Sequence, residues 1–323
     1  MARVLSYLKL LRAPNGFTAI ADICMGFLLA SVMTLGVLGI GSSRAPLGAF
    51  VALAVASWCL YSAGMVLNDV FDFSIDQQER PQRPLPSGQI PLSQARLLGF
   101  GLLLLGIVWG ALPGYLYSRE SGMPWRTGLM ALLLALAVLA YDGGLKKTWF
   151  GPVSMGLCRF LNVLLGMSLV AVPQGEAFSF LGYGPVHFLP AAGIGIYIVG
   201  VTWFARQEAG ISARTGLIGG GIVMALGISL LFCTVQWVPM PRLEPKWFGL
   251  LLILLSLSIA KRVLAAVTNP EGKQVQAAVK HAIFSLVMFD AAVCVLVAPW
   301  HYGVAVLALL FPMMWLGRWI YST

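Results

Sequence analysis

The sequence predicts an all-α integral membrane protein, a polytopic bundle of nine or ten transmembrane helices in a single domain over residues 1–323. Hydrophobic residues make up 59% of the chain and charged residues only 10%, whereas soluble domains carry about 25% charged residues. The apolar residues also form long continuous runs, and about 20 such residues cross a bilayer as a helix. Because the runs do not alternate with a period of two, they exclude a membrane β-barrel as well as a soluble fold.

The predicted spans follow one another along the whole chain. They cover residues 15–38, 46–67, 94–117, 125–141, 152–172, 188–205, 215–237, 246–267, 279–298 and 302–320. The fourth and sixth runs are short, and only the segment Pro299–Gly303 separates the last two. The number of spans is therefore nine or ten.

The basic residues are distributed unevenly over the predicted loops. With the N-terminus inside, the inner set has fifteen members: Arg3, Lys9, Arg12, Arg80, Arg83, Arg96, Lys146, Lys147, Arg206, Arg214, Lys261, Arg262, Lys273, Lys280 and Arg318. The outer set has five: Arg44, Arg119, Arg126, Arg242 and Lys246. Cytoplasmic loops carry such an excess, so we expect a cytoplasmic N-terminus in the cell (inner) membrane. The net charge of +9 then reflects orientation, and no nucleic-acid partner is expected.

Acidic residues concentrate after the second span. Four of the twelve acids fall within residues 69–79. If the helix continues, Asp69, Asp72 and Asp76 share one face, where their charges repel unless a cation lies among them. Carboxylate oxygens suit Mg²⁺, which takes the rest of its ligands from water and substrate phosphates. The stretch therefore predicts a Mg²⁺-diphosphate site rather than a solvated acidic loop, and we expect it on the cytoplasmic side.

The acidic stretch continues into arginines that can bind diphosphate oxygens through charge-assisted hydrogen bonds. The complete motif reads Asn68-Asp69-x-x-Asp72-x-x-x-Asp76, then Arg80-Pro81 and Arg83-Pro84-x-Pro86-x-Gly88. This string resembles the first aspartate-rich motif of the UbiA superfamily of intramembrane prenyltransferases, which also lies between the second and third spans. Other segments agree with the family: Arg12-Ala13-Pro14-Asn15, Tyr141-Asp142-Gly143-Gly144-Leu145-Lys146 and Arg159-x-x-Asn162-x-x-x-Gly166. The resemblance covers about residues 10–270.

The second aspartate-rich motif departs from the family pattern. The family usually has Asp-x-Glu-x-Asp after the sixth span, whereas this chain has Arg206-Gln207-Glu208-Ala209-Gly210. Only Glu208 remains, so Arg206 either supplies positive charge in place of a second ion or marks a decayed site. Together with Cys158–Asn162, this altered motif is similar to the UbiA-like branch called EboC.

The resemblance implies a Mg²⁺-dependent transfer of a prenyl group from a polyprenyl diphosphate to an aromatic or lipid acceptor within the membrane. It implies catalytic roles for Asp69, Asp72, Asp76, Lys146, Arg206 and Glu208, the first three also as metal ligands. Substrate-binding roles are expected for Asn15, Asp22, Asn68, Arg80, Arg83, Tyr141, Arg159 and Asn162. The alternative is a transporter or lipid-diphosphate binder that has lost turnover. Structural roles remain open for Asp22 and Arg159, and a structural or proton-linked role for Asp290.

Overall fold

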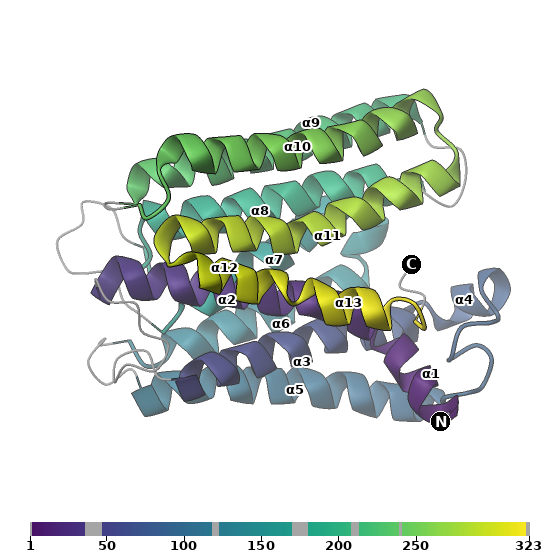
Figure 1. Ribbon diagram of the computed structural model, residues 1–323. Coiled ribbons are helices and arrows are strands. Elements are labelled where there is room, and N and C mark those ends of the chain that lie inside the picture. Colours follow the sequence, from purple (N-terminus) through teal and green to yellow (C-terminus); the bar gives the residue numbers. More distant parts are fainter. Residues whose placement is uncertain are drawn as a thin grey trace.

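The computed structural model describes residues 2–35, 47–117, 123–169, 180–207, 213–238 and 241–320. These residues form α-helices joined by short 3-10 helices and loops (Figure 1). The α-helices are α1 (Ala2–Leu10), α2 (Ala13–Leu35), α3 (Leu47–Phe71), α4 (Phe73–Glu79), α5 (Leu92–Tyr117), α6 (Arg126–Gly143), α7 (Gly151–Met167), α8 (Pro185–Phe204), α9 (Arg214–Cys233), α10 (Pro245–Thr268), α11 (Gly272–Val297), α12 (Trp300–Leu307) and α13 (Leu310–Leu316). The 3-10 helices are η1 (Leu145–Lys147), η2 (Ala205–Gln207) and η3 (Thr234–Trp237).

The polytopic helical bundle predicted from the apolar runs is confirmed. In the described part of the chain, 8 helices are long and apolar enough to cross a membrane, namely α2, α3, α5, α6, α8, α9, α10 and α11. Two shorter apolar segments accompany them: α7, and Trp300–Leu316, which forms α12 and α13 end to end. All ten predicted runs therefore correspond to helical segments that lie along one common direction (Figure 1).

The long helices pack as a closed ring. Each contacts the next one along the chain, from α2 through α3, α5, α6, α7, α8, α9 and α10 to α11, which packs back against α2. The α2 helix lies deepest, because α7 and α13 also cover it, and 72% of its apolar window is buried. The corresponding value for α10 is 17%, so α10 presents most of its surface outward, as a lipid-facing helix does.

Glycine allows α8 and α9 to approach closely. A Cβ atom on Gly200 of α8 would lie 2.7 Å from the carbonyl oxygen of Gly220, and a Cβ on Gly220 would lie 2.9 Å from that of Gly200. Gly193 and Gly227 form a second such pair along the same two helices. Small residues drive helix association in lipid because no hydrophobic force acts between apolar helices there.

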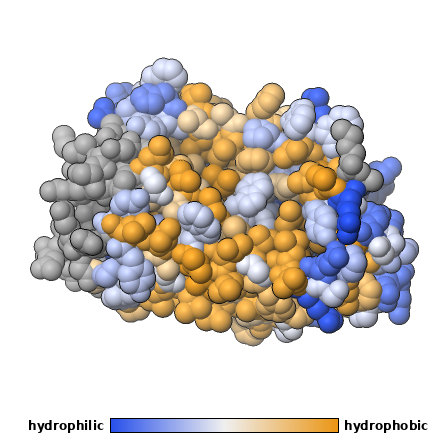
Figure 2. Space-filling model, turned by 90° about the horizontal axis from the view of Figure 1, so that it is seen from below, coloured by the Kyte–Doolittle hydropathy of each residue, from blue (hydrophilic) through white to orange (hydrophobic). Residues whose placement is uncertain are grey.

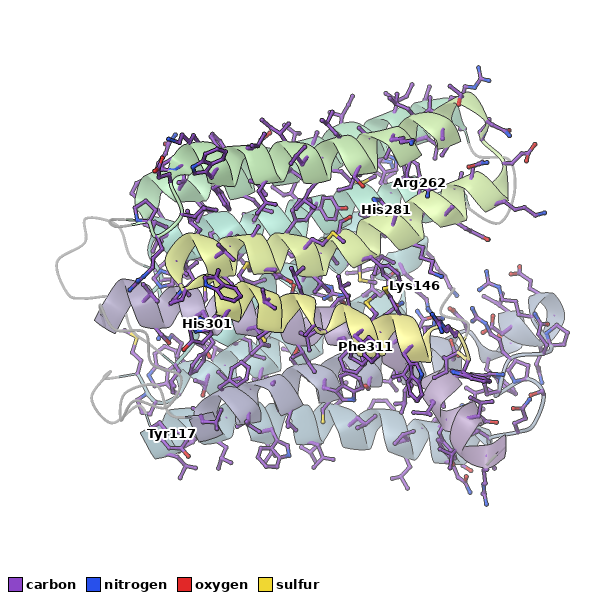
Figure 3. All side chains as sticks on the ribbon, in the orientation of Figure 1. Tyr117, Lys146, Arg262, His281, His301 and Phe311 are labelled. Carbon is purple, nitrogen blue, oxygen red and sulfur yellow. The ribbon has the colours of Figure 1, made fainter. Side chains whose placement is uncertain are left out.

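Polar residues lie toward the two ends of the bundle. Apolar residues cover the middle of the face in Figure 2, and one of the hydrophilic groups lies at the end that holds α1 and α4. Lys146 and Arg262, two members of the predicted inner set, lie toward this end, whereas Tyr117 and His301 lie toward the other (Figure 3). We call the end with α1 and α4 the basic end.

Candidate active site

The acidic segment lies at the basic end, where α3 passes into α4. Asp72 separates the two helices, yet its N–H donates to the Asn68 carbonyl (3.0 Å) and the Asp76 N–H donates to the Asp72 carbonyl (2.8 Å). The near-helical path preserves the spacing of Asp69, Asp72 and Asp76. Asp69 and Asp76 are buried, and Asp72 is half-buried.

A small apolar cluster holds the segment between α4 and α5 in place. Leu85 and Ile90 pack with Leu10 of α1 and Val66 of α3, and each is at most 3% exposed. Because this cluster fixes the loop beneath α1, it also fixes Arg83, which precedes Leu85 by two residues.

Arg83 lies between two of the aspartates. Its Nη1 is 2.7 Å from Asp76 Oδ2 and 3.3 Å from Asp69 Oδ1. Arg12, whose φ of 44° turns the chain between α1 and α2, places Nη2 3.3 Å from the same oxygen of Asp69. The repulsion expected among these carboxylates is thus relieved by two guanidinium groups.

Asp72 pairs with a different cation. Its Oδ2 accepts a hydrogen bond from Lys146 Nζ at 2.6 Å, and Lys147 Nζ lies 3.8 Å from its Oδ1. That Oδ1 atom is buried and has no hydrogen-bond donor among the described residues. Buried polar atoms usually have a partner, so an orphaned carboxylate oxygen indicates a ligand position.

A polar pocket of about 390 Å³ opens at this end. Its charged lining residues are the acids Asp72, Asp76 and Glu79 and the bases Arg80, Lys146, Lys147 and Arg206. We call it the charged pocket. Its four bases and three acids suit an anion accompanied by a divalent cation.

Arg206 reaches the charged pocket from η2. Its Nη2 donates to the carbonyl of Thr148 at 2.8 Å, which places the exposed guanidinium beside the segment after Lys147. The sequence-predicted Glu208 lies outside the described residues.

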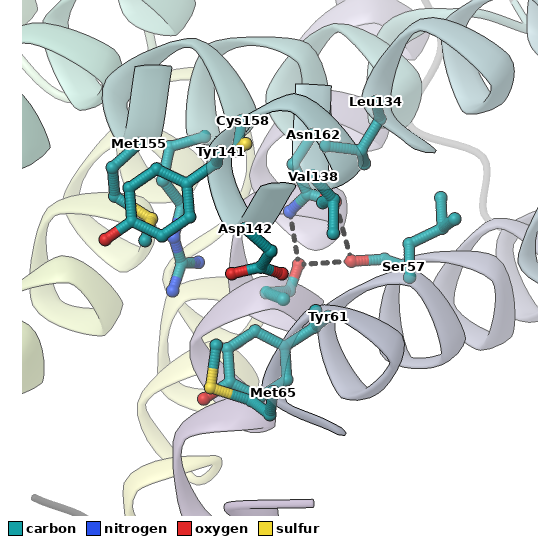
Figure 4. A pocket seen from close by; sticks show the side chains of 14 residues that line it. Ser57, Tyr61, Met65, Leu134, Val138, Tyr141, Asp142, Met155, Cys158 and Asn162 are labelled. Atoms are coloured by element: carbon teal, nitrogen blue, oxygen red, sulfur yellow. Dashed lines mark hydrogen bonds between the residues drawn. The ribbon is translucent and has the colours of Figure 1, made fainter. Parts of the chain in front are cut away.

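An apolar chamber of about 80 Å³ lies deeper in the bundle (Figure 4). Its walls come from α2, α3, α6 and α7 and include Leu60, Met65, Leu134, Val138 and Met155. Tyr141, at the end of α6, lines both this chamber and the charged pocket. The two spaces therefore share the side chain of Tyr141 as part of their walls.

Two predicted residues on α7 form the polar wall of the chamber. Arg159 Nη1 is 3.0 Å from Asp22 Oδ2, and Asn162 Nδ2 donates to the same oxygen at 2.9 Å. Asp22 itself is fully buried and does not line the chamber. Asn15, one turn into α2, lies beside Tyr61, another lining residue.

Sequence reasoning missed Asp142. This residue is 4% exposed and lines the chamber (Figure 4). It accepts a hydrogen bond from Asn68 Nδ2 at 2.9 Å. The available signal was an acid at the very end of an apolar span, directly after Tyr141. Charges at such positions mark function by default.

The donor set fits a magnesium ion completed by its substrate. Among the described residues, no group of three or more His, Cys, Asp or Glu side chains is arranged to hold a metal alone. Asp72 and Asp76 nevertheless both line the charged pocket, and Asp72 Oδ1 accepts no hydrogen bond from the described residues. Mg²⁺ commonly binds through one or two carboxylates plus substrate phosphates. Asp69 lies behind this pair, between Arg12 and Arg83.

Comparison with known proteins identifies relatives. The chain is 34% identical over 175 residues to the digeranylgeranylglyceryl phosphate synthase of Sulfurisphaera tokodaii, covering 54% of this chain and 53% of that one. It is 33% identical over 162 residues to the synthase of the same name from Saccharolobus solfataricus, covering 50% of each chain. The chain thus spans about half the length of the curated relatives it matches.

Solved structures share the fold. A structure described as digeranylgeranylglyceryl phosphate synthase has a TM-score of 0.57 at 20% identity, covering 95% of this chain and 99% of that one. A UbiA homolog from Archaeoglobus fulgidus bound to GPP and Mg²⁺ has a TM-score of 0.58 at 17% identity, covering 94% and 99%. A model of the UbiA prenyltransferase family matches residues 24–284, more than half of the sequence. The chain therefore belongs to the UbiA prenyltransferase family.

Proposed function

We propose that this protein transfers a prenyl group from a polyprenyl diphosphate to a polar acceptor in a Mg²⁺-dependent reaction inside the membrane. One observation carries the proposal. Tyr141 lines both a charged pocket with four bases and three acids and an apolar chamber. A donor with an anionic head and an apolar tail matches this junction, with its reacting carbon beside Tyr141.

The charged pocket supplies the groups that bind the diphosphate. Arg80, Lys146, Lys147 and Arg206 line it and can donate charge-assisted hydrogen bonds to phosphate oxygens. Asp72 and Asp76 would hold Mg²⁺, which when bound neutralises charge on the leaving diphosphate. Fixed cations aimed at developing negative charge usually provide the largest share of catalysis. Asp69 would act from behind by orienting Arg83.

The chamber, with a volume of about 80 Å³, supplies the environment for the reacting end of the prenyl chain. Its largely apolar walls would keep water from an allylic cation as the diphosphate leaves. The named relatives are digeranylgeranylglyceryl phosphate synthases, which favours a hydroxylated glyceryl phosphate lipid as the acceptor over an aromatic compound.

The basic end provides the orientation of the protein. Most Lys and Arg residues belong to the predicted inner set, and the charged pocket lies at the end where Lys146 and Arg262 are found. Cytoplasmic loops carry this excess of positive charge. We therefore place the charged pocket on the cytoplasmic face of the cell membrane, where water-soluble Mg²⁺ and the diphosphate head can reach it.

Replacing Asp72 tests the function. In the purified full chain, we expect Asp72→Ala to abolish Mg²⁺-dependent binding of geranylgeranyl diphosphate and its transfer to geranylgeranylglyceryl phosphate, because Asp72 lines the pocket and its Oδ1 accepts no hydrogen bond from the described residues. Glu244→Ala is the matched control, since Glu244 is an exposed acid paired with Lys246 at the other end of the bundle. Calorimetric titration with and without Mg²⁺ measures the binding, and mass spectrometry the product.

Two outcomes separate the proposal from its rival. Equal Mg²⁺-dependent binding by wild type and Asp72→Ala would contradict a metal-diphosphate role for the acidic segment. Tight binding by the wild type without product from either a glyceryl phosphate or a phenolic acceptor would instead favour a lipid-diphosphate binder or transporter.

A further inference from the structure

The chamber contains one carboxylate with an uncommitted oxygen. Asp142 Oδ1 accepts the hydrogen bond from Asn68, and among the described residues no group donates to its Oδ2. The only other charged group lining the chamber, Arg159, is already paired with Asp22. Asp142 is therefore the free proton acceptor in the wall of the chamber.

The position of Asp142 relates it to the reacting end of the donor. It follows Tyr141, which lines both spaces, and the pocket residues Lys146 and Asp72 are among its charged neighbours. The titratable and charged groups around it are Asp72, Lys146, Arg12, Tyr141 and Cys158. If the apolar tail of the donor enters the chamber, the carbon attached to the diphosphate lies at the chamber side of Tyr141, where Asp142 lines the wall.

A glycine keeps space beside the free oxygen. Gly64 of α3 lines the chamber, and a Cβ atom there would lie 3.9 Å from Asp142 Oδ2 and 3.1 Å from Val138 Cγ1. Any larger side chain at this position would fill the approach to Oδ2. The absence of a side chain leaves room for an acceptor hydroxyl.

We propose that Asp142 is the general base that removes the proton of the acceptor hydroxyl during prenyl transfer. In this step, which rests on the proposed function, the acceptor oxygen bonds to the allylic carbon as the bond from that carbon to the diphosphate oxygen breaks. The electron pair leaves with the diphosphate, and the hydroxyl proton moves to Asp142 Oδ2. Asn68 is a positioning residue, because its amide holds Oδ1 and so directs Oδ2 toward the open side.

The carboxylate of Asp22 is less suited to this role. It is fully buried, does not line the chamber, and accepts hydrogen bonds from both Arg159 and Asn162. A carboxylate committed to two donors is a weaker base and has no access to the acceptor. This contrast assigns proton removal to Asp142.

The test separates turnover from donor binding. With geranylgeranyl diphosphate, Mg²⁺ and geranylgeranylglyceryl phosphate, Asp142→Asn should lower kcat about 10²–10⁴-fold and leave donor affinity unchanged. The residual donor cleavage should shift from transfer toward hydrolysis, since the nucleophile is no longer deprotonated. Asp142→Glu should recover part of kcat. Gly64→Ala should raise KM for the acceptor by a larger factor than it raises the Kd of the donor, because the added methyl group lies beside Asp142 Oδ2.

The outcomes are distinguishable. If Asp142→Asn retains full kcat, Asp142 is not the base. If donor affinity falls in parallel with kcat, Asp142 is also not the base and only orients Asn68 through their hydrogen bond. An unchanged acceptor KM in Gly64→Ala would also overturn the assignment and does not depend on how Asp142→Asn folds. A wild type that neither binds the donor with Mg²⁺ nor transfers it contradicts the proposed function itself.

Discussion

Two clusters of carboxylates and cations differ in their access to ligands. The rim cluster at the basic end pairs Asp69 and Asp76 with Arg83, and Asp72 with Lys146 beside the charged pocket. The core cluster joins Asp22 of α2, Arg159 of α7 and Asp290 of α11, and both of its aspartates are fully buried.

The difference teaches that a carboxylate in an ion pair can bind a ligand only if it borders a pocket, as Asp72 and Asp76 do. A carboxylate that borders a pocket can release its Lys or Arg partner and bind a metal ion instead. The released Lys or Arg side chain can then bind the diphosphate. A pair enclosed in the bundle cannot exchange, because leaving either charge unpaired in low dielectric is strongly unfavourable. We therefore expect substitutions in the core cluster to act on stability and those in the rim cluster to act on binding.

The largest stability effect is expected at Arg159. Arg159→Leu would leave Asp22 as an unpaired buried charge, and breaking a buried pair in this way costs about 3–5 kcal/mol. The loss should appear as a lower midpoint of thermal unfolding in detergent. The double variant Arg159→Leu with Asp22→Asn is the control and should recover most of the stability, because it removes both charges. If Arg159→Leu is as stable as the wild type, the core cluster does not contribute to stability in the way that this comparison with the rim cluster requires.

The helices could be predicted from the sequence because lipid leaves few alternatives. Backbone polar groups in hydrocarbon must be satisfied within the segment, so each long apolar run forms a helix. All ten runs correspond to helical segments, including the short α7 and the divided pair α12 and α13.

The side-chain partners could be predicted only in part. Helical spacing placed Asp69, Asp72 and Asp76 together, but the sharing of Arg83 depends on Leu85 and Ile90 docking beneath α1. Such contacts join residues that no local pattern connects.

The core cluster could not be recognised as a unit for the same reason. Asp290 lies far from Asp22 in the sequence and meets it only because α11 packs back against α2 to close the ring. Asp142 was missed because its role depends on the space that Gly64 leaves open on another helix.

The next largest effect, on donor binding, is expected at Arg206, which lines the charged pocket and departs from the family motif. Arg206 lines the charged pocket, and a hydrogen bond from a charged donor contributes about 1.5–3 kcal/mol. Arg206→Ala should weaken binding of geranylgeranyl diphosphate by about one to two orders of magnitude, with little change in unfolding. Arg214→Ala is the matched control, since Arg214 is also an exposed arginine bonded to a backbone carbonyl but does not line this pocket.

The same titration decides whether Arg206 replaces an ion. If it does, the wild type should bind one Mg²⁺ per diphosphate, and Arg206→Asp with Gly210→Asp should give a steeper Mg²⁺ dependence. A wild type with two-ion cooperativity and indifference to Arg206→Ala would refute this role and point to a decayed second motif.

The smallest effect on stability is expected at Asp290. Substitutions there can distinguish a hydrogen-bonding role of this side chain from a role of its charge. Asp290 lies near Asp22 where α11 packs against α2, and among the described residues neither its oxygens nor Asp22 Oδ1 has a hydrogen-bond donor. A hydrogen bond between two carboxyl groups requires one proton, and Arg159 compensates only one negative charge, so we expect Asp290 to be protonated and to donate to Asp22.

Asp290→Asn should then be nearly neutral in thermal unfolding, because an amide N–H replaces the carboxyl O–H as donor. Asp290→Ala should cost about 1–3 kcal/mol, because it leaves a buried acceptor without a donor. If Asp290→Asn and Asp290→Ala lose equal stability, Asp290 contributes only volume. If Asp290→Asn stabilises the protein strongly, Asp22 and Asp290 are both ionised in the wild type and repel each other, and Asp290 is not protonated.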